Sequence, residues 1–146
     1  MKKVLLATDA SEHSIRAARL VHKMADNDPE MEVTVLHVIP LPEVLSPAVS
    51  AGATLTVPMQ LDEYLKGQLE HVLNVTLDAL DLPPERVRRA HAIGHAVESI
   101  LLEARQGRYD LIVLGRRGLS PIRELFVGSV SKGVLNGTPC PVLIVP

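Results

Sequence analysis

Residues 3–9 read Lys3-Val4-Leu5-Leu6-Ala7-Thr8-Asp9, a short aliphatic run that ends in two polar residues. A strand with one face in solvent would carry a polar residue at every second position, and this run does not. The pattern is typical of a strand that is covered on both faces, as in the middle of a parallel sheet. We therefore predict a central strand over residues 3–7, with Thr8 and Asp9 at its carboxyl end.

The rest of the chain alternates similar aliphatic runs with helical patterns. The runs predict further strands over residues 33–39, 86–93, 111–114 and 141–145. Between them, apolar residues spaced three and four apart predict helices over residues 12–25, 61–79, 97–104 and 129–135. The run at 86–93 is diluted by arginine, histidine and alanine, which favours an edge strand. Strict alternation predicts one domain over residues 1–146: a single doubly wound α/β fold, with five parallel strands in the order 3-2-1-4-5 and helices on both faces.

Small polar residues and glycines predict where the helices begin and end. Ser11 is placed to cap the first helix. Gly107 is expected to end the third helix in a left-handed conformation, and Asn136-Gly137 to end the last one. Residues 40–58 contain four prolines and show no period, so we predict a long loop that acts either as a lid or as a mobile excursion.

Composition excludes several classes of function. The chain has 146 residues, a formal net charge of -2 and 2% aromatic residues, so it lacks both the basic field and the stacking platforms that nucleic acid binding requires. No apolar run reaches the roughly twenty residues that cross a bilayer. The apolar run that follows Met1-Lys2-Lys3 is too short for a secretory signal, and Cys140 is the single cysteine. We expect a cytoplasmic protein without membrane insertion.

Chemistry is concentrated after the predicted strand at 111–114. There the chain reads Gly115-Arg116-Arg117-Gly118, and after nine further residues Gly128-Ser129-Val130-Ser131 opens the last helix. Glycines let a backbone approach phosphate oxygens closely, and the first N–H groups of a helix favour an anion. Taken alone, the spacing is equally compatible with ordinary turns. The paired arginines either tighten triphosphate binding or lie in solvent. The segment matches neither the P-loop nor the Gly-x-Gly-x-x-Gly fingerprint.

The segment resembles the ATP-binding signature of the universal stress protein family, which is Gly, two residues, Gly, nine residues, Gly, then Ser or Thr. All four positions match, at Gly115, Gly118, Gly128 and Ser129. The resemblance extends to the opening Val-Leu-Leu-Ala-Thr-Asp, to Leu36-His37-Val38 and to the closing residues 140–146.

This resemblance implies an ATP-binding homodimer that pairs through its last strand. By position, Thr8 and Asp9 would lie near the ribose or a metal–phosphate group, and the backbone of Val38 would face the adenine edge. The glycines and Ser129 would hold the phosphates, with Val130 and Ser131 completing the helix start. Mg²⁺ would arrive with the nucleotide and be held mainly by phosphate oxygens and water.

Other candidate residues have simpler interpretations. Asp9 at a strand end is also a common turn or capping residue, although its place at the predicted crevice favours a ligand role. His37 is expected to be a structural histidine with a hydrogen-bond partner, and Cys140 a packed thiol. The remaining histidines lack the spacing of a zinc site, so no structural metal is expected.

Three functions remain at this point. The first is a regulator whose nucleotide occupancy is read by a protein partner. The second is a slow ATPase or phosphotransferase that uses Asp9 with Mg²⁺, although no general base is evident. The third is a partner-binding module whose pocket is empty.

Overall fold

The structure, a computed structural model, describes residues 2–40, 59–116 and 128–146. Its strands are β1 (Lys3–Ala7), β2 (Glu32–Pro40), β3 (Val87–Gly94), β4 (Leu111–Gly115) and β5 (Val142–Val145). Its helices are α1 (Glu12–Asp26), α3 (Met59–Leu80), the short 3-10 helix η1 (Pro84–Arg86), α4 (Ala96–Gly107) and α5 (Ser129–Gly137). All strand pairs are parallel and the order is β3-β2-β1-β4-β5. The predicted fold and strand order are therefore confirmed.

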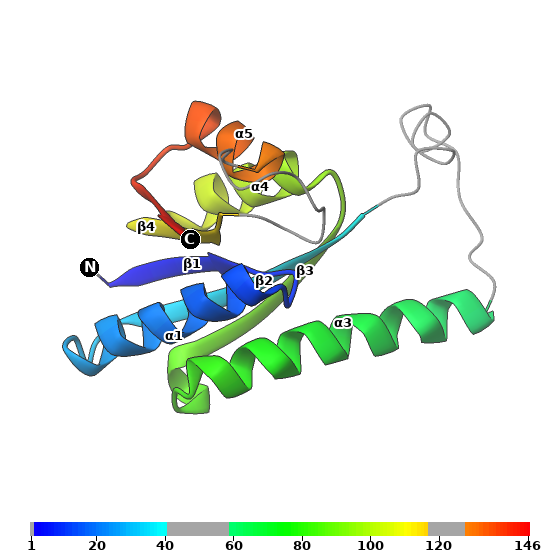
Figure 1. The fold of residues 1–146 in the computed structure, drawn as a ribbon, viewed down its shortest axis with the longest axis horizontal. Helices are drawn as coiled ribbons and strands as arrows, with labels where there is room; N and C mark the ends of the chain where they lie inside the picture. Colours follow the sequence, from blue (N-terminus) through cyan, green and yellow to red (C-terminus); the bar gives the residue numbers. More distant parts are fainter. Residues whose placement is uncertain (1, 41–58, 117–127) are drawn as a thin grey trace.

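Two apolar layers hold the helices on the sheet. Alternate strand residues such as Leu6 and Val35 pack with α1 and α3 on one face. Residues of the opposite parity, such as Leu5 and Ile112, pack with α4 and α5 on the other. Figure 1 shows these two helical layers with the sheet between them. Burial on both faces explains why the central strands contain almost no polar residues.

Most predicted boundaries of helices and strands lie within two residues of the observed ones. Ser11 caps α1 as predicted, because its hydroxyl accepts a hydrogen bond from the N–H of Ser14 at 3.4 Å. The polar run at 86–93 forms β3, an edge strand as expected. Pro40, the first residue of the predicted loop, instead ends β2 and pairs with Gly94. The rest of that predicted loop, residues 41–58, lies outside the described part.

The left-handed conformation predicted for Gly107 was wrong, whereas the predicted end of the last helix at Asn136-Gly137 is confirmed. The left-handed residue after α4 is Arg108, with φ 51°, whereas Gly107 is the last helical residue. A Cβ on Gly107 would stand 2.1 Å from Cε2 of Tyr109. Helix α5 ends at Gly137 as predicted, and a Cβ there would stand 2.7 Å from Cδ1 of Leu101 in α4. Both glycines therefore also provide room for a neighbouring side chain.

Arg86 ties the end of α1 to the start of β3. Its guanidinium donates to the carbonyls of Met31 at 3.0 Å, Ala25 at 3.2 Å and Asp28 at 2.8 Å. These carbonyls lie at the end of α1 and in the connection to β2, where those of Ala25 and Asp28 also accept backbone N–H groups. One side chain therefore bonds three backbone carbonyls of a connection far away in the sequence.

Candidate functional site at the carboxyl edge of the sheet

The carboxyl ends of β1 and β4 mark the point where the chain turns toward opposite faces. Ala7 pairs with Leu114 in register, so the residues after both strands emerge side by side. Helix α1 then leaves on one face and α5 lies on the other (Figure 1). In open parallel sheets such a switch point is the usual ligand site. The sequence prediction that Thr8, Asp9 and Gly115 share one edge is consistent with this register.

The described ends of the glycine segment lie together at this edge. The N–H of Gly128 donates to the carbonyl of Arg116 at 2.9 Å, and the N–H of Arg116 donates to the carbonyl of Val145 at 2.7 Å. The start of α5 is thereby fixed beside the end of β4. Arg117 and Gly118, which are part of the predicted phosphate site, lie outside the described residues.

Among the described residues, no side chain caps the start of α5. Its N-cap residue, Gly128, has no side chain to bond the first N–H groups, and Ser129 and Val130 are exposed. Ser131 is different: its side chain is buried, and its hydroxyl bonds the carbonyl of Gly115 at 3.1 Å. Uncapped N–H groups and the helix dipole favour an anion here. The Ser131 hydroxyl, by contrast, holds the helix onto the strand end.

The turn after β1 is held by its own side chains. Asp9 Oδ1 accepts a hydrogen bond from the N–H of Ser11 at 2.9 Å, and Thr8 Oγ1 accepts one from the N–H of Ala10 at 3.1 Å. Ala10 has φ 60°, a left-handed conformation that is uncommon for a residue other than glycine. Asp9 therefore has the turn role that the sequence also allowed, through its Oδ1 atom. The Thr8 side chain is buried under the turn and points away from the edge.

Strand β2 extends past the end of β1 and exposes backbone groups. The last β1–β2 register pair is Ala7 with Leu36, and Thr8 N–H donates to the Leu36 carbonyl at 2.9 Å. Backbone groups of alternate residues point to the same side, so those of Val38 face the space where β1 has ended. This is the position that the resemblance implied for an adenine contact. His37 is half-buried and its Nδ1 lies 2.8 Å from the Thr8 carbonyl, which confirms that it has a structural partner.

Two buried nitrogens at this edge have no hydrogen-bond partner among the described residues. They are Nε of Arg116 and Nδ1 of His13. His13 lies in the first turn of α1, against β4: a Cβ on Gly115 would stand 2.9 Å from His13 Cβ and 2.6 Å from the Ser14 nitrogen. Buried polar groups almost always have partners, so the unpaired Arg116 Nε–H, which can only donate, fits an anion that supplies the missing acceptor. Sequence reasoning missed His13, because its proximity to Gly115 follows only from helix docking.

A scan against family models matches the Universal stress protein family over residues 1–146. The chain belongs to the universal stress protein family. It is 35% identical to a universal stress protein of Thermus aquaticus, over 99% of this chain and 98% of that one. It is 30% identical to the universal stress protein YxiE of Bacillus subtilis, over 98% and 97% of the two chains.

Solved structures give the same relationship. The protein MJ0577 of Methanocaldococcus jannaschii superposes with a TM-score of 0.78 and 26% identity, over 99% of this chain and 94% of that one. A universal stress protein of Archaeoglobus fulgidus in complex with dAMP has a TM-score of 0.64 and 19% identity, over 100% and 98% of the chains. A family member from Arabidopsis thaliana with AMP bound has a TM-score of 0.62 and 20% identity, over 99% and 91%. At 19% and 20% identity, the similarity to these two structures establishes that the chain shares their fold.

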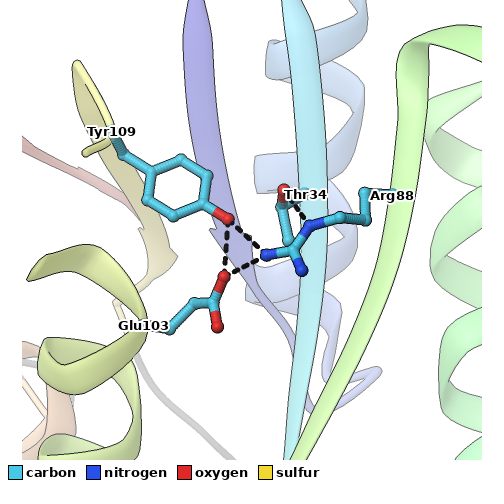
Figure 2. Close-up of polar contacts among 4 residues, drawn as sticks. All are labelled: Thr34, Arg88, Glu103 and Tyr109. Atoms are coloured by element: carbon cyan, nitrogen blue, oxygen red, sulfur yellow. Dashed lines mark hydrogen bonds and ion pairs between the residues drawn. The ribbon is translucent and has the colours of Figure 1, made fainter. Parts of the chain in front are cut away.

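The opposite, amino-terminal edge of this family member carries a different polar cluster. The Arg88 guanidinium donates to Glu103, to the Tyr109 hydroxyl at 2.7 Å and to Thr34 at 3.3 Å, while Tyr109 donates to Glu103 at 2.7 Å (Figure 2). Burial raises the pKa of Tyr109, and the hydrogen bond with Tyr109 raises that of Arg88. A cavity of about 420 Å³ lies beside this cluster. Because these groups bond to one another, we assign the cluster to joining β2, β3 and α4.

The remaining predictions concern metals, membranes and the thiol. Within residues 2–40, 59–116 and 128–146, no three histidine, cysteine, aspartate or glutamate side chains gather where they could hold a metal ion. In the same part of the chain, no helix combines the length and apolarity of a membrane span. Cys140 is half-buried and packs against the α4–α5 layer, which agrees with the predicted packed thiol.

Proposed function

We propose that this chain binds an adenine nucleotide, with ATP as its main ligand, and acts as a cytoplasmic, homodimeric regulator. One observation carries the proposal. The uncapped start of α5 lies beside Arg116, whose buried Nε has no partner among the described residues. An uncapped helix start with an adjacent unpaired guanidinium donor is suited to phosphate oxygens. The matching Gly115, Gly118, Gly128 and Ser129 positions of the family signature support the same ligand.

Each part of a nucleotide has residues that suit it at this edge. The backbone N–H groups of Ser129 and Val130 and the side chain of Arg116 would hold phosphates. The backbone of Val38, free of β1 on one side, would meet the adenine edge, and Asp9 would lie near the ribose or a phosphate-bound Mg²⁺. The dAMP and AMP complexes of other universal stress proteins are consistent with an adenine nucleotide on this fold.

A regulatory role is favoured over rapid hydrolysis. Transfer of a phosphoryl group needs a base or a positioned nucleophile beside the terminal phosphate. Asp9 is a carboxylate at this edge within the described part of the chain, and one of its oxygens is already bonded to the N–H of Ser11. Nucleotide occupancy would instead shift the chain between two states that a protein partner distinguishes.

Calorimetric titration with ATP and AMP tests the ligand. The wild-type chain is expected to bind ATP at micromolar or tighter affinity. Arg116→Met removes the unpaired donor while leaving both backbone bonds of residue 116, and should weaken ATP binding about tenfold or more. Arg19→Met, an equal loss of charge on an exposed face of α1, is the matched control and should bind as wild type. Absence of any nucleotide, in titration and by mass spectrometry of the purified protein, would contradict the proposal.

Incubation with labelled ATP tests the regulatory role. The ATP should remain largely intact after hours. Release of phosphate or self-labelling that is lost in Asp9→Ala would instead support the slow enzyme. If nucleotide is never bound and a partner still binds, the chain is a partner-binding module with this fold.

A further inference from the structure

Three buried hydroxyl groups form a hydrogen-bonded cluster beneath the turn that follows β1. They belong to Thr8 at the strand end, Ser14 in α1 and Thr76 in α3, and are 6%, 3% and 0% exposed respectively. The Thr8 and Thr76 oxygens lie 2.8 Å apart, and those of Thr8 and Ser14 lie 3.2 Å apart. The cluster thus joins the candidate site to a helix that contributes none of its predicted ligands.

Counting protons gives the direction of these bonds. A threonine or serine hydroxyl has one proton to donate. Thr76 uses its proton on the carbonyl of Val72 at 2.8 Å, and Ser14 uses its proton on the carbonyl of Ser11 at 2.9 Å. Thr8 is therefore the donor toward both neighbours, and its one proton is shared between Thr76 at 2.8 Å and Ser14 at 3.2 Å, with Thr76 the nearer acceptor. With its proton directed at these two oxygens, Thr8 presents a lone pair to the N–H of Ala10 at 3.1 Å.

Ala10 needs such a partner. Its φ of 60° is disfavoured for a side chain with a Cβ, so the surrounding contacts must hold it. The bond to Thr8 Oγ1 fixes its N–H, and the next N–H, that of Ser11, is fixed by Asp9 Oδ1. The orientation of the Asp9 carboxylate therefore depends on the rotamer of Thr8, and this rotamer depends on the acceptor that Thr76 provides.

We propose that Thr76 is a positioning residue for the nucleotide site: it orients the Thr8 hydroxyl, which keeps Ala10 left-handed and the Asp9 carboxylate directed at the ligand. The inference rests on the proposed nucleotide binding for its effect on affinity, but not for its effect on the turn. It gives α3, which packs on α1 through Leu69 and Leu73, a defined contact with the binding edge.

The test compares Thr76→Val with Thr76→Ser. Valine has nearly the shape of threonine but cannot accept a hydrogen bond, whereas serine keeps the hydroxyl. We expect Thr76→Val to speed hydrogen exchange of the Ala10 amide about tenfold or more and to weaken ATP binding several-fold in calorimetry. Thr76→Ser should restore both values toward wild type. If Thr76→Val is unfolded at the assay temperature, the smaller Thr76→Ala serves for the same two measurements.

A core variant separates positioning from general stability. Leu69→Ala removes buried apolar atoms two helical turns from Thr76 and should lower the melting temperature while leaving Ala10 exchange and ATP affinity unchanged. The inference is overturned if Thr76→Val leaves Ala10 protected, if it speeds exchange without weakening ATP binding, or if Leu69→Ala produces the same pair of changes. If the wild-type chain binds no ATP, the proposed function fails, and the exchange rates of Ala10 alone decide whether Thr76 holds the turn.

Discussion

The ring of Tyr109 occupies the space that a side chain on Gly107 would need. A Cβ at residue 107 would stand 2.1 Å from Cε2 of that ring, and the ring itself is buried against the α4–α5 layer. The Tyr109 hydroxyl then reaches Arg88 and Glu103. The absence of a side chain at residue 107 thus determines where this cluster forms.

Replacing Gly107 with alanine should destabilise the folded protein, although alanine is the better helix former. Gly107→Ala is expected to lower the free energy of unfolding by about 1–3 kcal/mol, because the ring or the helix end must move. Gly67→Ala is the matched control: Gly67 lies within α3 with nothing within 4 Å of its Cβ position. That variant should raise the free energy of unfolding by about 0.5–1 kcal/mol. Urea unfolding measures both, and changes of the same sign would contradict this account.

Tyr109 should titrate above the ordinary range of tyrosine. Burial raises its pKa, so the folded state holds the phenol proton more tightly than the unfolded state does. The corresponding stability is fully present below about pH 10, the unfolded value, and is lost as pH rises through the folded value. In Tyr64→Phe, Tyr109 is the only tyrosine left, and ultraviolet titration of that variant reports its ionisation directly. A titration midpoint at or below about pH 10 would contradict the expected increase in the pKa of Tyr109.

Asp110 should matter for stability mainly in acid. Its carboxylate accepts the N–H groups of Lys2 at 2.8 Å and Lys3 at 2.9 Å, and these bonds lower its pKa. The stabilisation is present above the unfolded pKa and disappears as pH falls through the lower folded value. Asp110→Asn should therefore lower the melting temperature at neutral pH and reduce the loss of stability on acidification. Asp78→Asn, the same substitution at an exposed position of α3, is the matched control for the melting temperature at neutral pH.

The homodimer proposed through β5 can be tested without disturbing the sheet. The carbonyls of Pro141 and Val145 accept bonds from β4, so the alternate residues Val142 and Ile144 direct their backbone groups outward. Ile144→Pro removes an outward N–H and should yield a folded monomer in sedimentation. Leu143→Pro places the proline on the side paired with β4 and should reduce the melting temperature as well. Sedimentation of the wild-type chain as a monomer at tens of micromolar would rule out this mode of assembly.

The sequence predicted the fold because its central strands are unambiguous. Residues 3–7 and 111–114 are continuous aliphatic runs, and burial on both faces of a parallel sheet is the arrangement that suits them. The turn at Asp9 and the start of α5 at Ser129 could be located because they directly follow recognisable local signals.

What the sequence did not predict depends on contacts between distant elements. Gly107 resembled a left-handed helix terminator, and only the docked positions of Tyr109 and Leu101 reveal the room that Gly107 and Gly137 leave for them. His13 and Thr76 gave no local signal, since each acquires its significance from a neighbour on another element. Periodicity shows that a helix packs on the sheet, but not which atoms meet at the interface.

The contacts of Arg86 also bear on how the chain matures during synthesis. Its three acceptors at Ala25, Asp28 and Met31 precede it by 61, 58 and 55 residues. A nascent polypeptide that has left the ribosome only as far as β2 carries those carbonyls without this donor. The first β-α-β unit therefore gains these three hydrogen bonds only when translation has supplied the last residue of η1, long after its own amino acids have been joined.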